Sequence, residues 1–228
     1  MESVFPFPSA PFVPVHGSGA VFPVRRVYCV GRNYADHARE MGMDPNREPP
    51  FFFGKPHDVL VPGGGEVPYP PATSNLHYEV ELVVALSKGG RDISVAEAMG
   101  HIYGYAVGID LTRRDLQAKA KDKGQPWDTA KGFDQSAPIS TIVPVTSGGH
   151  RESGAIWLTV NGVEKQRGDL SQMTWSVPEV IAHISRFMEL APGDLLFTGT
   201  PSGVGPIVRG DRIRGGIDGL GEVEIVLV

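Results

Sequence analysis

The pattern most able to do chemistry in this chain is a pair of glutamates one residue apart in an apolar stretch. Glu79 and Glu81 lie in His77-Tyr-Glu-Val-Glu-Leu-Val-Val-Ala-Leu86, which predicts a β-strand. Alternate side chains of a strand share one face, so the two carboxylates lie side by side, about 7 Å apart along the backbone. Two like charges raise each other's pKa unless a cation lies between them. Asp110 ends the next apolar run, and the three carboxylates together predict a site for a divalent metal ion.

All three predicted ligands are carboxylate oxygens, which favours Mg²⁺, with Mn²⁺ as a substitute, over zinc. His77 shares the face of Glu79 and is a possible further ligand, although a histidine in such a place more often orients a carboxylate. The alternative is that the glutamates lie on a solvated strand face, and their spacing alone leaves that interpretation open.

A second candidate pair is His37 and Glu40, within residues 31–42, which predict a short helix closed by Gly42. Residues three apart are neighbours on one helix face. A carboxylate beside an imidazole fixes its tautomer and raises its basicity, as a general base requires. An ordinary surface pair is the alternative. The loop that follows, residues 43–50, makes a lid over the substrate a further possibility.

The segment Thr198-Gly-Thr-Pro-Ser-Gly-Val-Gly205 is rich in glycine and hydroxyl groups. Its backbone N–H groups and the Thr200 hydroxyl can hold an anionic group. A plain turn between strands is the alternative. Without the lysine of a Walker motif, the segment does not predict a nucleotide-binding loop.

Six motifs in order along residues 25–228 resemble the fumarylacetoacetate hydrolase family, most closely its acylpyruvase and fumarylpyruvate hydrolase branch. They are Gly31-Arg-Asn-Tyr-Ala-Asp-His37, Phe53-Gly-Lys-Pro56, Tyr78-Glu-Val-Glu-Leu82, Gly108-Ile-Asp110, Lys131-Gly-Phe-Asp134 and Thr198-Gly-Thr-Pro-Ser-Gly-Val204.

The resemblance implies a fold and a set of roles. The implied fold class is α+β and sheet-dominated: a mixed β-sheet roll with a few short helices, assembled as a homodimer. The implied metal ligands, for Mg²⁺ or Mn²⁺, are Glu79, Glu81 and Asp110. The implied catalytic residues are His37, Glu40 and Lys131. Residues implied to line the substrate pocket are Arg32, Lys55, Gln117 and Thr200.

The activity that the resemblance implies is hydrolysis of the C3–C4 bond of an acylpyruvate, with fumarylpyruvate giving fumarate and pyruvate. Decarboxylation of oxaloacetate, and hydration or isomerisation of unsaturated 2-oxo acids, use related chemistry and stay open. A metal-binding protein without catalysis is a remoter alternative. Replacement of the base pair or of the lysine in the sequence would indicate such a protein, but all of these residues are present. Residues 43–50 and 121–128 are expected to set the specificity for the acyl group. Within them, Arg47 and Lys123 either reach a second carboxylate of the substrate or are simply solvated.

Composition limits the other possibilities. The chain has 228 residues, 41% hydrophobic and 21% charged, as in ordinary globular proteins. A formal net charge of −5 does not indicate the basic surface that a nucleic-acid-binding protein needs. No apolar run approaches the ~20 residues that cross a bilayer, and we expect no leader and no membrane partner. The single cysteine, Cys29, fits a reducing compartment, so we expect a cytoplasmic protein.

The 29 glycines and 20 prolines predict many short strands joined by turns. Residues 1–23, with five prolines, predict an extended arm on the body or on a partner subunit, and residues 24–228 a single catalytic domain. Asn161-Gly162 predicts a hairpin turn. Strands are expected near 24–30, 51–53, 79–86, 103–109, 139–144, 155–161, 194–198 and 222–227.

Three Ser/Thr-x-x-acid patterns predict helix starts: Ser94-x-x-Glu97, Thr112-x-x-Asp115 and Ser176-x-x-Glu179. The second helix is expected to run to about Gly124. The third is expected to carry an apolar face of Val177, Val180, Ile181, Ile184, Phe187 and Met188.

Overall fold

The structure is a computed structural model that describes residues 3–6, 9–40 and 48–228. Its central element is a curled mixed sheet of eight strands, in the order β4-β3-β15-β8-β9-β11-β5, with β12 paired to β9. Strands β3 and β15 are parallel, as are β11 and β5. The bounds are β3 (Arg26–Gly31), β4 (Phe51–Lys55), β5 (Leu60–Pro62), β8 (Val80–Leu86), β9 (Ile102–Ile109), β11 (Ala137–Ile139), β12 (Val143–Pro144) and β15 (Asp194–Phe197).

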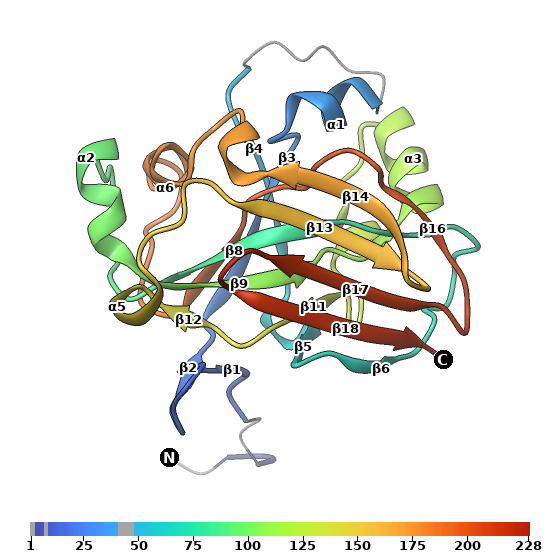
Figure 1. The fold of residues 1–228 in the computed structure, drawn as a ribbon, viewed down its shortest axis with the longest axis horizontal. Coiled ribbons are helices and arrows are strands. Elements are labelled where there is room, and N and C mark those ends of the chain that lie inside the picture. Colours follow the sequence, from blue (N-terminus) through green and yellow to red (C-terminus); the bar gives the residue numbers. More distant parts are fainter. Residues whose placement is uncertain (1–2, 7–8, 41–47) are drawn as a thin grey trace.

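Three further sheets complete the described part of the chain. A five-stranded sheet has the order β14-β13-β17-β18-β6, and lies in front of the central sheet in Figure 1. Its strands are β6 (Gly65–Val67), β13 (Ala155–Val160), β14 (Val163–Asp169), β17 (Arg212–Ile217) and β18 (Gly221–Leu227). The smaller sheets contain β1 (Phe12–Pro14) with β2 (Val21–Pro23), and β10 (Thr112–Arg113) and β16 (Gly205–Ile207) on either side of β7 (Leu76–Tyr78).

The described helices are all short. The α-helices are α1 (Ala35–Glu40), α2 (Val95–Ala98), α3 (Arg114–Asp122), α4 (Asp128–Lys131), α5 (Val145–Gly148) and α6 (Val177–Ile184). The 3₁₀ turns are η1 (His57–Val59), η2 (Met99–His101) and η3 (Leu170–Gln172). None of these helices combines the length and the apolar character that a bilayer crossing requires.

Strand β8 is buried on both faces, which explains its unbroken apolar run. Val80, Leu82 and Val84 belong to a cluster that includes the inner side chains of the five-stranded sheet. Val83 and Ala85 belong to a second cluster on the opposite face of the sheet. By alternation Glu81 shares the face of these two residues, so its carboxylate projects from the beginning of a buried strand.

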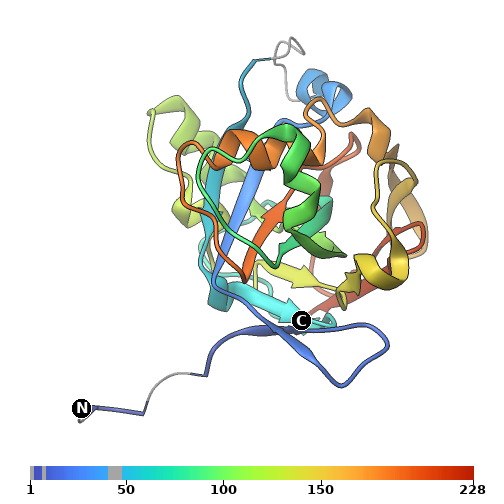
Figure 2. The same cartoon turned by 90° about the vertical axis from the view of Figure 1, so that its left-hand side faces the viewer.

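The hairpin β1–β2 closes the second cluster from outside, and Figure 2 shows it lying along one end of the body. Val13 and Phe22 are buried there, and the amide of Ile142 donates to the carbonyl of Pro14 at 2.9 Å. Part of the proline-rich segment is therefore paired strand, packed against the rest of the chain.

Some sequence predictions of the local structure hold and others fail. Ser176 and Glu179 form the predicted capping box of α6, and Asn161 and Gly162, both at positive φ, form the predicted hairpin turn. The cap predicted at Thr112 is wrong, because Thr112 belongs to β10 and the helix begins at Arg114.

The apolar face predicted for the third helix is also too long. The helix ends at Ile184, so Phe187 and Met188 lie beyond it and are exposed. The first predicted helix starts late, at Ala35, because Gly31 pairs with Phe51 in the sheet. Its predicted end, Gly42, lies outside the described residues.

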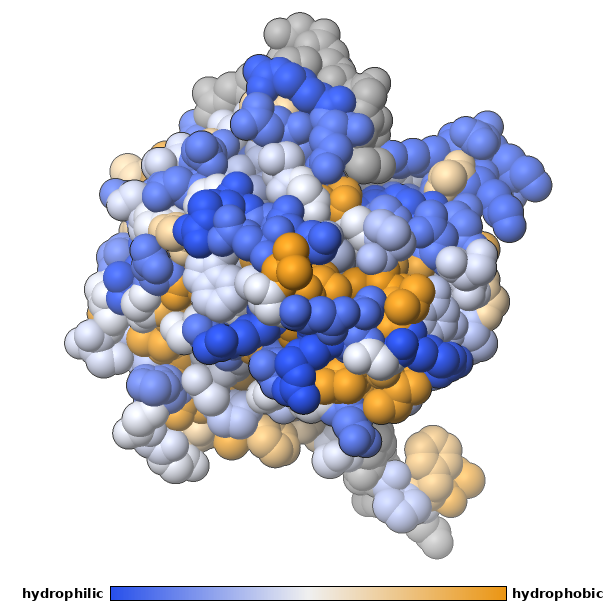
Figure 3. Space-filling view, turned by 45° about the vertical axis from the view of Figure 1, so that its right-hand side comes forward, coloured by the Kyte–Doolittle hydropathy of each residue, from blue (hydrophilic) through white to orange (hydrophobic). Residues whose placement is uncertain are grey.

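The surface seen in Figure 3 is mainly hydrophilic, with smaller hydrophobic areas between the charged side chains. Three of the exposed hydrophobic side chains are Val163, Val208 and Val228, which lie at the ends of strands or in the turns between them. Scattered exposure of this kind is normal for a folded protein.

Candidate metal and catalytic site

Neighbouring strands bring the three predicted carboxylates together. Glu79 immediately precedes β8, Glu81 lies within it, and Asp110 follows the antiparallel partner β9. The amide of Asp110 donates to the carbonyl of Glu79 at 2.8 Å, which closes the strand ends on each other. All three side chains are buried, and each offers an oxygen within 4.8 Å of the others. That spacing fits one cation shared by three carboxylates.

Two lysines and an arginine already contact this cluster. Nζ of Lys131 lies 2.7 Å from Oδ2 of Asp110 and 2.8 Å from Oε2 of Glu79. Nζ of Lys55 lies 2.9 Å from Oδ1 of Asp110, and Nη2 of Arg114 lies 2.5 Å from Oε1 of Glu79. Buried charges need such partners, and here each carboxylate except Glu81 has one.

The carboxyl groups therefore differ in character. Burial acts to raise the pKa of Glu79, but the charges of Lys131 and Arg114 outweigh it and hold that pKa well below its usual range. Burial, Asp110 and Glu79 raise the pKa of Glu81 well above its ordinary value. Within the described part of the chain Glu81 forms no ion pair, and its carboxylate accepts a hydrogen bond from the amide of Gly199 at 2.8 Å.

A divalent cation at this cluster would supply the partner that Glu81 lacks. The donor set of three carboxylates is that of Mg²⁺ or Mn²⁺, and Glu79, Glu81 and Asp110 would hold the ion. His77 is not part of the group, since its Nε2 pairs with Oδ1 of Asn75 at 2.9 Å.

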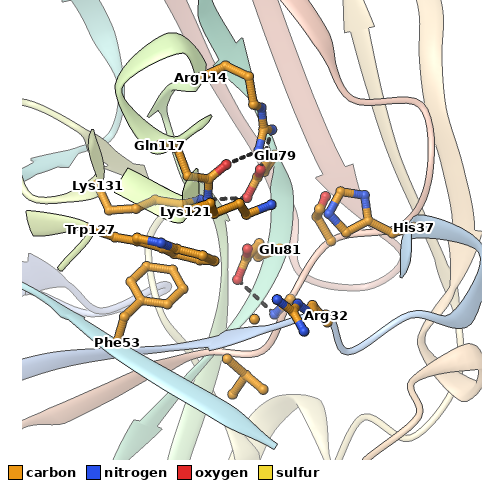
Figure 4. A pocket seen from close by; sticks show the side chains of 14 residues that line it. Arg32, His37, Phe53, Glu79, Glu81, Arg114, Gln117, Lys121, Trp127 and Lys131 are labelled. Carbon is orange, nitrogen blue, oxygen red and sulfur yellow. Dashed lines mark hydrogen bonds and ion pairs between the residues drawn. The ribbon is translucent and has the colours of Figure 1, made fainter. Parts of the chain in front are cut away.

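The cluster faces a pocket that also contains the predicted base (Figure 4). The imidazole of His37 is buried and directed into this pocket, across from Glu79 and Glu81. Its Nδ1 lies 3.3 Å from Oε2 of Glu40. An Nδ1–H that donates to Glu40 leaves Nε2 as the basic nitrogen. Burial lowers the pKa of His37, although Glu79 and Glu40 oppose the shift, so the ring is neutral at neutral pH.

The glycine-rich segment after β15 holds the protein's own carboxylates. The amide of Gly199 donates to Glu81, and the amide of Gly203 donates to Glu40 at 3.1 Å to each oxygen. Both glycines have φ of +97°. A Cβ added to Gly199 would lie 2.8 Å from Cβ of Asn33, and a Cβ added to Gly203 would lie 2.1 Å from the carbonyl oxygen of Lys165. Only glycine satisfies both conditions. The backbone anion site predicted for this segment is therefore used internally.

Three of the four predicted substrate residues line the pocket: Arg32, Gln117 and Thr200. Oε1 of Gln117 accepts from Arg114 at 2.7 Å, and Oγ1 of Thr200 accepts from Nε2 of Gln166 at 2.8 Å. The Thr200 hydroxyl proton is thus available to a ligand, because a hydroxyl both accepts and donates.

Lys55 occupies a different place from the one predicted. Its side chain is fully buried behind Asp110, where Nζ donates to the carbonyls of Lys131 and Ser136. It is not among the residues that line the pocket. The structure therefore corrects the predicted substrate contact: Lys55 supports Asp110 from behind.

Four lining residues had no individual role in the sequence analysis: Phe53, Arg114, Lys121 and Trp127. Arg114 stands three residues before Gln117 on α3, and that i,i+3 spacing was the available signal. Lys121 and Trp127 fall within the expected specificity segment 121–128. Lys123 is exposed and does not line the pocket, and Arg47 lies outside the described residues.

Comparisons with known proteins identify the family of this chain. Residues 26–228 match the family model of the fumarylacetoacetate (FAA) hydrolase C-terminal domain. A fumarylpyruvate hydrolase of Ralstonia sp is 48% identical over 185 residues, which are 81% of this chain and 96% of that protein. An oxaloacetate tautomerase of Bos taurus is 44% identical over 196 residues, 86% of this chain and 88% of that protein.

A solved structure is closely similar as well. It is the fumarylpyruvate hydrolase from Pseudomonas aeruginosa in complex with Mn²⁺ and pyruvate, 53% identical, with a TM-score of 0.98 over 100% of this chain and 99% of that one. The expected sheet-dominated roll with few short helices is confirmed. The chain belongs to the fumarylacetoacetate hydrolase family.

Proposed function

We propose that this protein is a metal-dependent hydrolase that cleaves the C3–C4 bond of an acylpyruvate, with fumarylpyruvate as its substrate. The observation that carries the proposal is the placement of the His37–Glu40 pair across one pocket from the buried cluster of Glu79, Glu81 and Asp110. The Pseudomonas aeruginosa structure supports it, because pyruvate is a product of this reaction.

When bound at the three carboxylates, Mg²⁺ or Mn²⁺ supplies a Lewis acid for the 2-oxo group of the substrate. Around it, the chain's own residues orient the pyruvate end. The Thr200 hydroxyl and the Gln117 amide line the same pocket and can donate to the C1 carboxylate. Their positions are fixed by Gln166 and Arg114, so little freedom is lost on binding.

The neutral imidazole of His37 provides the base. Nε2 takes a proton from a water molecule, whose oxygen attacks C4, while Glu40 stabilises the imidazolium through Nδ1. The C3–C4 bond then breaks, the new acid leaves with the attacking oxygen, and the electron pair becomes the enolate of pyruvate. His37 returns its proton to C3, which completes the balance.

Lys131 lies where negative charge develops. Its ammonium group is buried beside Glu79 and Asp110, and burial, which acts to lower its pKa, is outweighed by these carboxylates. A fixed cation in a water-poor pocket stabilises an enolate more than a solvated one does.

A second candidate function acts on oxaloacetate, as the Bos taurus relative does. Decarboxylation, tautomerisation, or the hydration and isomerisation of unsaturated 2-oxo acids use the same enolate chemistry. Hydrolysis and hydration both need an activated water, whereas decarboxylation, tautomerisation and isomerisation do not, and the buried His37–Glu40 pair supports a reaction that consumes water. Because that pair and Lys131 are intact, a non-catalytic metal-binding protein is disfavoured.

A steady-state comparison of fumarylpyruvate, acetylpyruvate and oxaloacetate tests the proposal, with Mg²⁺, with Mn²⁺ and after chelation. We expect the highest kcat/KM for fumarylpyruvate, and loss of turnover with the chelator. A higher kcat/KM for oxaloacetate than for either acylpyruvate would replace the proposal by the second candidate.

Three further features are proposals that rest on the family resemblance. They are Mg²⁺ as the native ion, a homodimer, and a single catalytic domain over 24–228 with an N-terminal arm. Metal analysis of the purified protein and light scattering after size exclusion test the first two.

A further inference from the structure

A second cavity adjoins the pocket over the carboxylate cluster. It encloses about 510 Å³ between strand β4 and the end of helix α3. Four residues line both spaces: Arg32, Phe53, Lys121 and Trp127. The two cavities therefore adjoin at these four side chains, which Figure 4 shows around the first pocket together with Glu81 and His37.

Two of the shared residues, Arg32 and Lys121, are cations that have no anionic partner among the described residues. In the described part of the chain neither Arg32 nor Lys121 forms an ion pair, whereas Lys131 and Arg114 are both bound to Glu79. Lys121 is half-buried, and burial with the charges of Arg114 and Arg32 lowers its pKa. Like charges that share a partly desolvated space favour an anion between them.

The backbone of Arg32 fits a functional position. Arg32 has φ of +63°, a conformation that costs free energy for a residue with a side chain. It directly follows β3, and this turn leaves its side chain in the lining of both cavities.

The other two shared residues are flat aromatic walls. The ring centroids of Phe53 and Trp127 lie 5.8 Å apart, and Phe51 packs edge-on against Trp127 at 5.0 Å. Nζ of Lys121 lies 5.5 Å from the Trp127 ring centroid. Such walls suit a planar, conjugated group that ends in an anion.

We propose that Arg32 and Lys121, beside the Phe53–Trp127 wall, form a subsite for a second carboxylate on the acyl group of the substrate. The subsite selects acylpyruvates whose acyl group is a planar unsaturated acid over those with a neutral acyl group. The inference rests on the proposed function, since it places the C4 end of the substrate at His37. It assigns the specificity role to Lys121 and not to Lys55 or Lys123.

The test compares kcat/KM for fumarylpyruvate with that for acetylpyruvate, which lacks the second carboxylate. In Lys121→Met we expect the ratio of the two to fall about 10- to 100-fold, the range of a lost charge-assisted contact. Lys121→Arg should restore most of the ratio. Lys119→Met removes a charge from an exposed position of the same helix, and its ratio should stay within about two-fold of the wild type.

Product inhibition gives a readout that does not depend on turnover of two substrates. Fumarate and crotonate differ by one carboxylate in place of a methyl group. We expect fumarate to inhibit the wild type more strongly than crotonate, and Lys121→Met to remove that difference. An unchanged ratio and an unchanged difference in Lys121→Met would overturn the subsite. If the wild type hydrolysed no acylpyruvate, the proposed function itself would fall.

Discussion

Lys131 and Asp110 form a fully buried ion pair, with Nζ 2.7 Å from Oδ2. The same ammonium group contacts Glu79, so one side chain pairs with two of the three carboxylates in the cluster. Together Lys55, Lys131 and Arg114 balance the charges of Glu79, Glu81 and Asp110. A divalent cation added to this cluster leaves an excess of positive charge, which an anionic ligand can offset.

The first prediction concerns Lys131→Met. Without added metal, we expect the free energy of unfolding to fall by about 3–5 kcal/mol, because two buried carboxylates each lose one of their two cationic partners. Saturating Mn²⁺ should recover a larger part of the stability in the variant than it adds to the wild type. Denaturant unfolding with and without Mn²⁺ measures both effects, with the exposed Lys119→Met as the control. Equal gains from Mn²⁺ in both proteins would contradict this charge balance.

Glu81→Gln should weaken metal binding while the fold is kept. The amide keeps the shape and can still accept from Gly199, but it removes a metal ligand and a buried charge that repels Asp110 and Glu79. We expect Mn²⁺ to bind at least about 100-fold more weakly. Replacing a residue that only orients a metal ligand already lowers metal affinity about 10- to 100-fold, and Glu81 is itself a proposed ligand. Calorimetric titration with Mn²⁺ measures the affinity, and the exposed Glu66→Gln is the control. Retained affinity would exclude Glu81 as a ligand.

The sequence predicted the metal cluster because alternation along an extended segment is a local property. Glu79 and Glu81 share a face whatever the rest of the chain does. Asp110 was found through its place at the end of an apolar strand. The family resemblance then indicated the roles of His37 and Lys131.

The second layer of the site depends on tertiary contacts that no local pattern contains. Lys55 precedes a proline in a motif of the family, and nothing in that motif says that its side chain points behind Asp110. Likewise, Gly203 and Glu40 are far apart in sequence, and only the fold shows that one holds the other. The cap predicted at Thr112 failed because strand pairing with β7 outweighs a helix signal.

Replacing His37 should distinguish hydrolysis from the reactions that need no water. We expect His37→Gln to lower kcat for acylpyruvate hydrolysis by about 10²- to 10⁴-fold, because the base for water is lost. Mn²⁺ affinity should be unchanged, since His37 is not in the carboxylate group. Turnover of oxaloacetate, if present, should fall less. The exposed His57→Gln is the control, and an equal loss for both substrates would show that His37 has a role other than water activation.

The pH profile should report the same histidine. His37 acts as a base only when neutral, so activity rises as the pH rises through its pKa. Because burial lowers that pKa from the ordinary value of 6.5, the acid limb of log kcat/KM should lie below pH 6.5. Glu40 opposes this shift, so Glu40→Gln should move the limb to still lower pH and reduce the plateau. A limb above pH 6.5, or a shift to higher pH in the variant, would contradict the assignment.

From the charge balance around Lys131 we also expect that the binding of the metal ion and the binding of an anionic substrate strengthen each other. When Glu79, Glu81 and Asp110 are all ionised, as they are when they hold a metal ion, Lys55, Lys131 and Arg114 balance their charges. The ion then adds positive charge that should favour an anion in the pocket, and the reverse must hold by the same factor. We expect pyruvate to tighten Mn²⁺ binding about 10-fold, and Mn²⁺ to tighten pyruvate binding equally. Acetate, a carboxylate without the 2-oxo group, should have a much smaller effect. Calorimetric titrations in both orders measure the two factors, and a Mn²⁺ affinity that is the same with and without pyruvate would show that the buried cations do not link the two sites.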